Sequence, residues 1–256
     1  MGKIYYQDVG CADCTIIHAN DGSVFLIDCH DIESQKQLLP SSKKVRGVFI
    51  THQHSDHFSG LSFLRNNGYR IDELIYSPYN RRHNDSSVTI DEWNEFKGHR
   101  DYFERKGTNC TAPYRQSSWD KPFWKTNGLQ FEIIGPAKSI ATSATRELHD
   151  ACLVVKAKCG KSNVLFAGDA SDDNLNYIAK NTSNFCNGIL HASHHGSING
   201  ADLEFIKKCN ATDTIISTKS GVYSNVPHAT ALRRYKENTK NKVFRTDVDG
   251  NLTTTF

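Results

Sequence analysis

The run from His52 to His57, His-Gln-His-Ser-Asp-His, constrains this chain more than any other feature of its sequence. It directly follows residues 45–51, Val-Arg-Gly-Val-Phe-Ile-Thr, whose apolar and β-branched composition is typical of a buried strand. Imidazole and carboxylate groups are common protein ligands of zinc and manganese. Alternate side chains point the same way, so His52 and His54 are predicted to bind one ion, and Asp56 and His57 a second. We therefore expect two divalent ions, Zn²⁺ or Mn²⁺, at a strand end.

Two ions need ligands from elsewhere in the chain, and two later segments offer them. His149 precedes an apolar run and is expected to be the third histidine on the first ion, with an exposed loop histidine as the alternative. Asp169 follows residues 164–168, Val-Leu-Phe-Ala-Gly, which are typical of a buried strand with a glycine for close approach. A carboxylate at that place is expected to bridge the two ions.

Further polar residues complete the candidate site. His194 and His195 follow a strand-type segment at residues 189–192, and we favour His194 as the last ligand of the second ion because it lies nearer the strand. Asp28 ends another strand-type segment and is expected to orient a ligating histidine, with a turn aspartate as the alternative. His228 would donate to a phosphate or a leaving group, unless it is a surface histidine before a helix.

The hydrophobic pattern predicts an α/β (α+β) sandwich, in which two mixed β-sheets pack face to face with helices outside. Asp-Gly between two strand-type segments indicates a hairpin early in the chain. The 256 residues suit one domain over 1–256, with a less regular insertion at about 70–128. Aromatic residues at 119–124 of that insertion either line a substrate cleft or pack as core or lid. Strands are expected at residues 4–9, 15–18, 23–28, 45–51, 129–134, 152–158, 164–167, 189–192, 214–218, 242–246 and 252–256, and helices at 91–106, 173–180, 202–208 and 230–238.

Composition narrows the setting in which the chain works. Eight cysteines in a chain without a signal-peptide pattern predict free, buried thiols, and a redox or metal role for the lone pair Cys11 and Cys14 is the weaker alternative. The sequence has no run of 18 apolar residues, so no membrane-spanning helix is expected. A cytoplasmic location follows as the expectation. The net charge of +3 is mild and neither requires nor repels a phosphate substrate.

Several short motifs together resemble one family over nearly the whole chain. Residues 8–13, Asp-Val-Gly-Cys-Ala-Asp, are similar to a DVGxGD pattern, Gly168-Asp169 to a GD motif, and residues 194–197 to an HHGS motif. Residues 215–217, 227–228 and 244–250 match a C-terminal pattern. These motifs resemble the metallo-β-lactamase superfamily, and within it the soluble hydrolase domain of ComEC-type competence proteins. His149 stands where that branch often carries an asparagine, and a histidine there would make the first metal site more like that of generic members of the superfamily.

The resemblance implies the αββα metallo-β-lactamase sandwich and a dinuclear metal-dependent hydrolase. A hydroxide bridging the two ions would attack phosphorus or a carbonyl carbon, with Asp56, His195 and His228 as the catalytic candidates. The expected reaction is phosphodiester hydrolysis in nucleic acid, a nucleotide or a small phosphodiester. A lactone or thioester hydrolase, and a metal-binding scaffold without turnover, stay open as alternatives. Zinc β-lactamases match less well, because a histidine, His57, directly follows the aspartate of the motif here.

Overall fold

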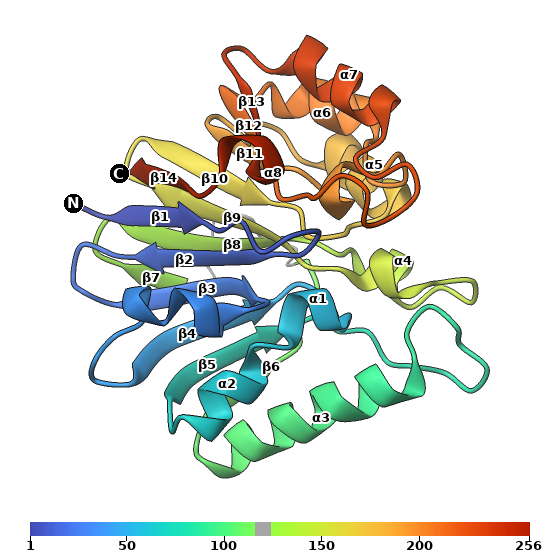
Figure 1. Cartoon of the computed structure of the whole chain (residues 1–256). Coiled ribbons are helices and arrows are strands. Elements are labelled where there is room, and N and C mark those ends of the chain that lie inside the picture. The colour runs from blue at the N-terminus through green and yellow to red at the C-terminus, as the bar shows by residue number, and fades with distance from the viewer. Residues whose placement is uncertain (116–123) are drawn as a thin grey trace.

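The expected sandwich of two mixed β-sheets between layers of helices is confirmed (Figure 1). The computed structural model describes residues 1–115 and 124–256. In spatial order, the first sheet contains β14 (Leu252–Thr255), β1 (Lys3–Tyr6), β2 (Cys14–His18), β3 (Val24–Cys29), β4 (Lys44–Ile50), β5 (Arg70–Tyr76) and β6 (Asn109–Thr111). The second contains β13 (Val243–Arg245), β12 (Asp213–Ile216), β11 (Ile189–His191), β10 (Ser162–Phe166), β9 (Val154–Cys159), β8 (Leu129–Gly135) and β7 (Trp124–Thr126).

Helices cover the outer face of each sheet. The first sheet packs against α1 (Ser55–Phe58), α2 (Leu61–Asn66) and α3 (Ile90–Arg105), and the second against α5 (Asp172–Asn181), α6 (Leu203–Cys209) and α7 (Ala229–Asn238). The short helices are α4 (Lys138–Ala141), α8 (Thr246–Asp249) and the 3₁₀ turns η1 (Ile32–Leu38), η2 (Leu148–Ala151) and η3 (His194–Gly196). Helix α3 begins with a capping box, in which the Thr89 side chain accepts from the Glu92 backbone and Glu92 accepts from the Thr89 backbone.

Strand β3 shows why the sequence builds two apolar layers at once. Successive side chains of a strand point to opposite faces, so Phe25 and Ile27 face the other sheet while Leu26 faces the helices. All six residues of β3 are buried, as is typical of a strand covered on both faces. Between the sheets, the rings of Phe49 and Phe131 lie 4.8 Å apart. Burying such a ring stabilises the fold by about 1.5–3 kcal/mol.

Both sheets contain a parallel half, and this half positions the site. Strands β3, β4, β5 and β6 run parallel, and so do β10, β11, β12 and β13. Strands β1 and β14 pair antiparallel, so the two ends of the chain lie side by side at the opposite edge of Figure 1 from α4. The carboxyl ends of the parallel strands of both sheets meet at one edge of the sandwich, which is where such architectures place their chemistry.

The structure agrees with some of the expected elements and differs from others. The hairpin of β2 and β3 is confirmed, with His18 opposite Val24, and all eight cysteines are free, seven of them buried. Within the irregular stretch expected at about 70–128, residues 70–76 form strand β5, paired in parallel with β4. Of the aromatic residues at 119–124, Trp124 packs between the sheets against Phe25, and the others lie outside the described residues. In the described part of the chain, no helix is long and apolar enough to cross a membrane.

A test of this packing uses the close approach at Gly60, between α1 and α2. A Cβ atom there would lie 1.8 Å from the backbone oxygen of Cys29. We expect Gly60→Ala to lower the free energy of unfolding by about 1–3 kcal/mol, because backbone must shift to admit the methyl group. Gly98, exposed on α3 with nothing within 4 Å, is the matched control. Gly98→Ala should raise the free energy of unfolding in urea by about 0.5–1 kcal/mol, and equal effects of the two changes would contradict the packing.

Candidate metal centre

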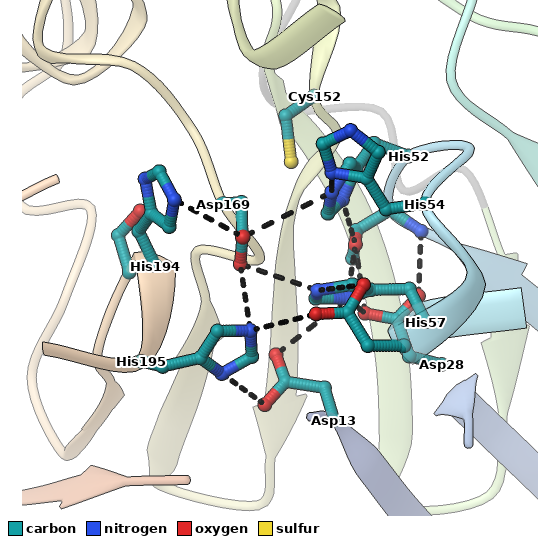
Figure 2. A network of polar contacts seen from close by, with 12 residues as sticks. Asp13, Asp28, His52, His54, His57, Cys152, Asp169, His194 and His195 are labelled. Carbon is teal, nitrogen blue, oxygen red and sulfur yellow. Dashed lines mark hydrogen bonds and ion pairs between the residues drawn. The ribbon is translucent and has the colours of Figure 1, made fainter. Parts of the chain in front are cut away.

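The candidate site lies where strands from both sheets end together. Strand β4 leads directly into His52, β10 leads through Gly168 to Asp169, and β11 leads to His194 and His195 (Figure 2). Backbone hydrogen bonds tie these ends to one another. The His194 N–H donates to the Gly168 oxygen over 3.0 Å. The Leu153 N–H, just before β9, donates to the Thr51 oxygen of the other sheet over 2.8 Å.

A buried carboxylate, Asp169, occupies the middle of the site (Figure 2). Its Oδ2 lies 3.9 Å from Nε2 of His52 and 3.7 Å from Nε2 of His194. Its Oδ1 lies 3.3 Å from Nε2 of His57 and 3.7 Å from Nε2 of His195. The two oxygens of one side chain therefore face two different sets of histidines, which is the arrangement of a bridging ligand.

The remaining candidate ligands fall into two groups on either side of this carboxylate. His52, His54 and His149 form one group, and Asp56, His57 and His195 form the other. Within each group the ligand atoms lie within 4.8 Å of one another. His52 and His54 turn ring nitrogens toward each other at 3.0 Å.

Hydrogen bonds to the outer ring nitrogens fix how several imidazoles are oriented. Carbonyl oxygens only accept hydrogen bonds, so Nδ1 of His195, 3.0 Å from the Ser217 oxygen, carries a hydrogen, as does Nε2 of His54, 2.8 Å from the Ser87 oxygen. Nδ1 of His194 likewise donates to the Asn199 oxygen over 3.2 Å. In each ring the other nitrogen is therefore the atom that a metal ion would bind.

Asp28 likewise fixes the orientation of His57 by a hydrogen bond. Its Oδ2 accepts from Nδ1 of His57 over 2.8 Å, and its two oxygens accept from the backbone and hydroxyl of Thr51, each over 2.7 Å. Asp28 is buried and adopts a left-handed backbone conformation, with φ of 52°. Such strain is common where a side chain must be aimed for function. This contact places Asp28 behind His57, at the position proposed for an orienting acid.

Unusual backbone also shapes the other side of the site. His194 and His195 both have left-handed φ angles, 52° and 51°, which non-glycine residues rarely adopt. Gly168, with φ of 49°, precedes Asp169, and a Cβ there would lie 2.6 Å from Cβ of Thr51 and 2.8 Å from Sγ of Cys152. Only glycine lets this loop come close enough to set Asp169 beside the histidines.

Burial and charge divide the histidines into two electrostatic classes. Burial lowers the pKa of His52 well below its usual value, and that of His149 to about 3, so both are neutral ligands near neutral pH. Burial also opposes the charged forms of His57 and His195, but nearby carboxylates, Asp169 first among them, outweigh it. They raise the pKa of His57 well above its usual value and that of His195 to about 9.

Several buried atoms at this centre have no hydrogen-bond partner among the described residues. They are Nε2 of His57, His149 and His195, and Oδ1 of Asp169. A buried polar atom without a partner costs about 1–3 kcal/mol, so native proteins rarely leave several together. Divalent cations would satisfy these lone pairs, and the residues present therefore fit a metal centre.

Two residues lie differently from the sequence expectation. His195, and not His194, lies beside Asp56, with Nε2 3.6 Å from Oδ2, whereas His194 groups with His149 and Asp169. The left-handed backbone at both histidines separates their side chains in a way that distance from the strand does not reveal. His228 caps α7 by accepting from the Thr230 N–H over 3.1 Å, and it is not among the residues that line the site's cavity.

Asp13 is a buried carboxylate that was not expected among the site residues. It lies 3.9 Å from Nδ1 of His57, 3.8 Å from Nδ1 of His195 and 4.0 Å from Nε2 of His191. In the sequence, Asp13 is the acid that ends the motif at residues 8–13, and this position was the sign that could have identified it.

The site opens into a cavity of about 250 Å³ lined by His54, Asp56, Asp169, His194, His195, Tyr223 and Val226.

Comparisons with known proteins agree with this architecture. The family model described as the metallo-beta-lactamase superfamily matches residues 9–208. No curated protein matches the chain. The metallo-beta-lactamase fold protein YhfI from Bacillus subtilis is 13% identical, with a TM-score of 0.56 over 98% of this chain and 100% of its own.

Two further solved structures are similar in fold. A diphosphatase from the PhnP family is 13% identical, with a TM-score of 0.55 over 100% of this chain and 98% of its own. A long form RNase Z from yeast is 12% identical, with a TM-score of 0.57 over 96% of this chain and 41% of its own. At these identities the likeness concerns the fold alone.

The contact between Asp28 and His57 gives a test of metal affinity. We expect Asp28→Asn to weaken zinc binding by about 10–100-fold, because the residue that orients the imidazole loses its charge. Asp31→Asn makes the same chemical change at an exposed position three residues later and should leave the affinity within about twofold. Competition titration with a chromophoric chelator measures both. Equal zinc affinities in the two variants would contradict the orienting role.

The raised pKa values of His57 and His195 predict proton release when metal binds. Both imidazoles carry a proton near neutral pH in the metal-free protein, and a cation must displace it. The apparent affinity for zinc should therefore rise with pH from about pH 6 to about pH 9. Calorimetry in buffers of different ionisation enthalpy measures the protons released. Heats of binding that do not depend on the buffer would contradict this prediction.

Proposed function

Because this chain belongs to the metallo-β-lactamase superfamily, we propose that it is a dinuclear metal-dependent hydrolase that cleaves phosphodiester bonds. The observation that carries the proposal is Asp169, whose two oxygens face separate groups of histidines. His52, His54 and His149 would hold the first ion, and Asp56, His57 and His195 the second, with Asp169 shared between them. Zn²⁺ and Mn²⁺ both suit this set of nitrogen and oxygen ligands.

Bound ions, the oriented histidines and the cavity would each contribute to the reaction. Bound divalent ions would act as Lewis acids and lower the pKa of a bound water toward about 7. Asp28 and Thr51 hold His57 in one orientation, and the carbonyl of Ser217 does the same for His195. The cavity beside these groups gives a substrate one approach to them.

We assign His194 to the substrate side of the centre. Its side chain is 25% exposed, whereas those of His57 and His195 are almost completely buried. It lines the cavity and is held by the Asn199 carbonyl, so it can contact a scissile group or its leaving oxygen. His228, engaged in capping α7, lacks comparable support for that role.

Two kinds of support favour phosphodiesters over carbonyl substrates. A site with two cations spreads the charge of a phosphoryl group in the transition state. Similar folds include a diphosphatase of the PhnP family, an RNase Z and the protein named yeast PDE1. The sequence motifs resemble the hydrolase domain of ComEC-type proteins, which points to nucleic acid or nucleotides as the substrate class.

The test is hydrolysis of bis-p-nitrophenyl phosphate by purified protein, first stripped of metal and then reloaded with zinc or manganese. We expect removal of metal, or the double change Asp56→Ala with His57→Ala, to lower turnover by more than about a hundredfold, because the second ion is lost. His83→Ala, at an exposed histidine outside the centre, is the control and should retain full turnover.

Each other result has a defined meaning. Turnover that survives chelation would contradict a metal mechanism. Two bound ions per chain without phosphodiester turnover would move the assignment to a lactone or thioester substrate, which the same assay tests with p-nitrophenyl acetate and a γ-lactone. A protein that binds two ions and is inert on every ester would be a metal-binding scaffold.

A further inference from the structure

The rim of the cavity carries an exposed aromatic residue that the metal chemistry does not use. Tyr223 is 55% exposed and is one of five large hydrophobic residues so exposed in the described part of the chain. It lines the cavity beside Asp56, Asp169 and His194. Val222, the residue before it, is 51% exposed. Two neighbouring exposed apolar side chains at the mouth of a cavity form the kind of surface that borders ligand-binding grooves.

The loop that carries Tyr223 is fastened to the protein at both ends. At its start, the Ser220 N–H donates to Oδ2 of Asp247 over 2.9 Å, and the Arg245 guanidinium donates to the Ser220 hydroxyl over 2.7 Å. At its end, the His228 N–H donates to the Gly196 oxygen over 2.9 Å, directly beside His195. The loop that carries Tyr223 is therefore held in place beside the candidate metal ligands.

The size of the cavity limits what can enter it. Its volume of about 250 Å³ is below the roughly 300–1,000 Å³ that encloses a drug-sized molecule. A phosphoryl group fits there, but a whole nucleotide does not, so the base of a nucleotide must lie at the rim. The Tyr223 ring carries no charge near neutral pH, as is ordinary for tyrosine. A neutral, partly exposed ring at that place is a surface for stacking.

We propose that Tyr223 is a specificity-determining residue whose ring stacks on the nucleobase next to the scissile phosphodiester. The substrate class is then nucleotides or single-stranded nucleic acid, in preference to small alkyl phosphodiesters. Stacking tolerates every base, because each base has a flat aromatic face, so little preference among bases is expected. This inference rests on the proposed phosphodiesterase function, and it adds the part of the substrate that lies outside the cavity.

The experiment compares two esters that share the scissile bond and the leaving group. They are the p-nitrophenyl ester of thymidine 5′-monophosphate, which carries a base, and methyl p-nitrophenyl phosphate, which does not. We expect Tyr223→Ala to lower the ratio of kcat/KM for the first ester to that for the second by about tenfold, mostly through KM. Tyr223→Phe keeps the ring and should retain the ratio. Val248→Ala, at a residue 71% exposed on α8, is the matched control.

A binding measurement separates this inference from the proposed function. Calorimetry of thymidine 5′-monophosphate with zinc-loaded protein should show about tenfold weaker binding for Tyr223→Ala than for Tyr223→Phe. If neither ester is cleaved but this difference is found, the phosphodiesterase proposal fails and the stacking stands. If both esters are cleaved and the ratio does not change in Tyr223→Ala, the stacking fails and the phosphodiesterase stands. Equal losses in the Phe and Ala variants would show that the hydroxyl matters, and would also overturn the stacking.

Discussion

The buried carboxylate of Asp169 is the group on which the rest of the site depends. An ionised carboxylate inside a protein costs several kcal/mol unless opposite charge or hydrogen bonds compensate it. Burial alone would raise its pKa, but His195, His57 and His194 together hold the pKa of Asp169 well below its usual range. Those histidines come from two different segments of the chain. The charge of one residue is therefore balanced only when the strand ends of both sheets are in place.

Because of this dependence, metal binding would be coupled to the charge balance at this edge of the sandwich. Without cations, protons on His57 and His195 supply the positive charge that Asp169, Asp28 and Asp56 require. Divalent cations would supply more charge, and would also satisfy buried lone pairs that lack hydrogen-bond partners. The same ligands would then exchange protons for ions without moving far, because carbonyl and carboxylate acceptors already fix several of the rings.

Much of the fold and of the ligand set could be predicted from the sequence because local patterns carry it. Apolar segments such as β3 and β4 are buried on both faces, so they stand out from their surroundings. The candidate ligands at residues 52–57 lie within six consecutive positions, so their spacing alone indicates which of them lie close together. Asp28 could be singled out because it ends a strand-type segment of the sequence.

Other features depend on contacts between distant residues and leave little local trace. The side chains of His194 and His195 lie in different groups because both residues have a left-handed backbone. Glycine and asparagine favour that conformation, but neither stands at these positions, so the sequence does not reveal it. Strand β5 was missed because its burial depends on β4 beside it. His228 was expected to donate to a phosphate or a leaving group, but its Nδ1 accepts from the first turn of α7, as fits the alternative of a histidine before a helix.

The residues around Asp169 and the residues at the rim of the cavity are held in different ways. His57 and His195 are oriented by groups from other segments of the chain, so a change there would disturb the charge balance of the site. Tyr223 is different, because its loop is fastened through Ser220 and the backbone of His228, and its ring is left exposed. A substitution at that ring alters what lies beside the scissile bond without altering the hydrogen bonds that orient His57 or His195. If Tyr223 stacks on the substrate as proposed, substrate preference could change at the rim while the arrangement of the candidate metal ligands stays the same.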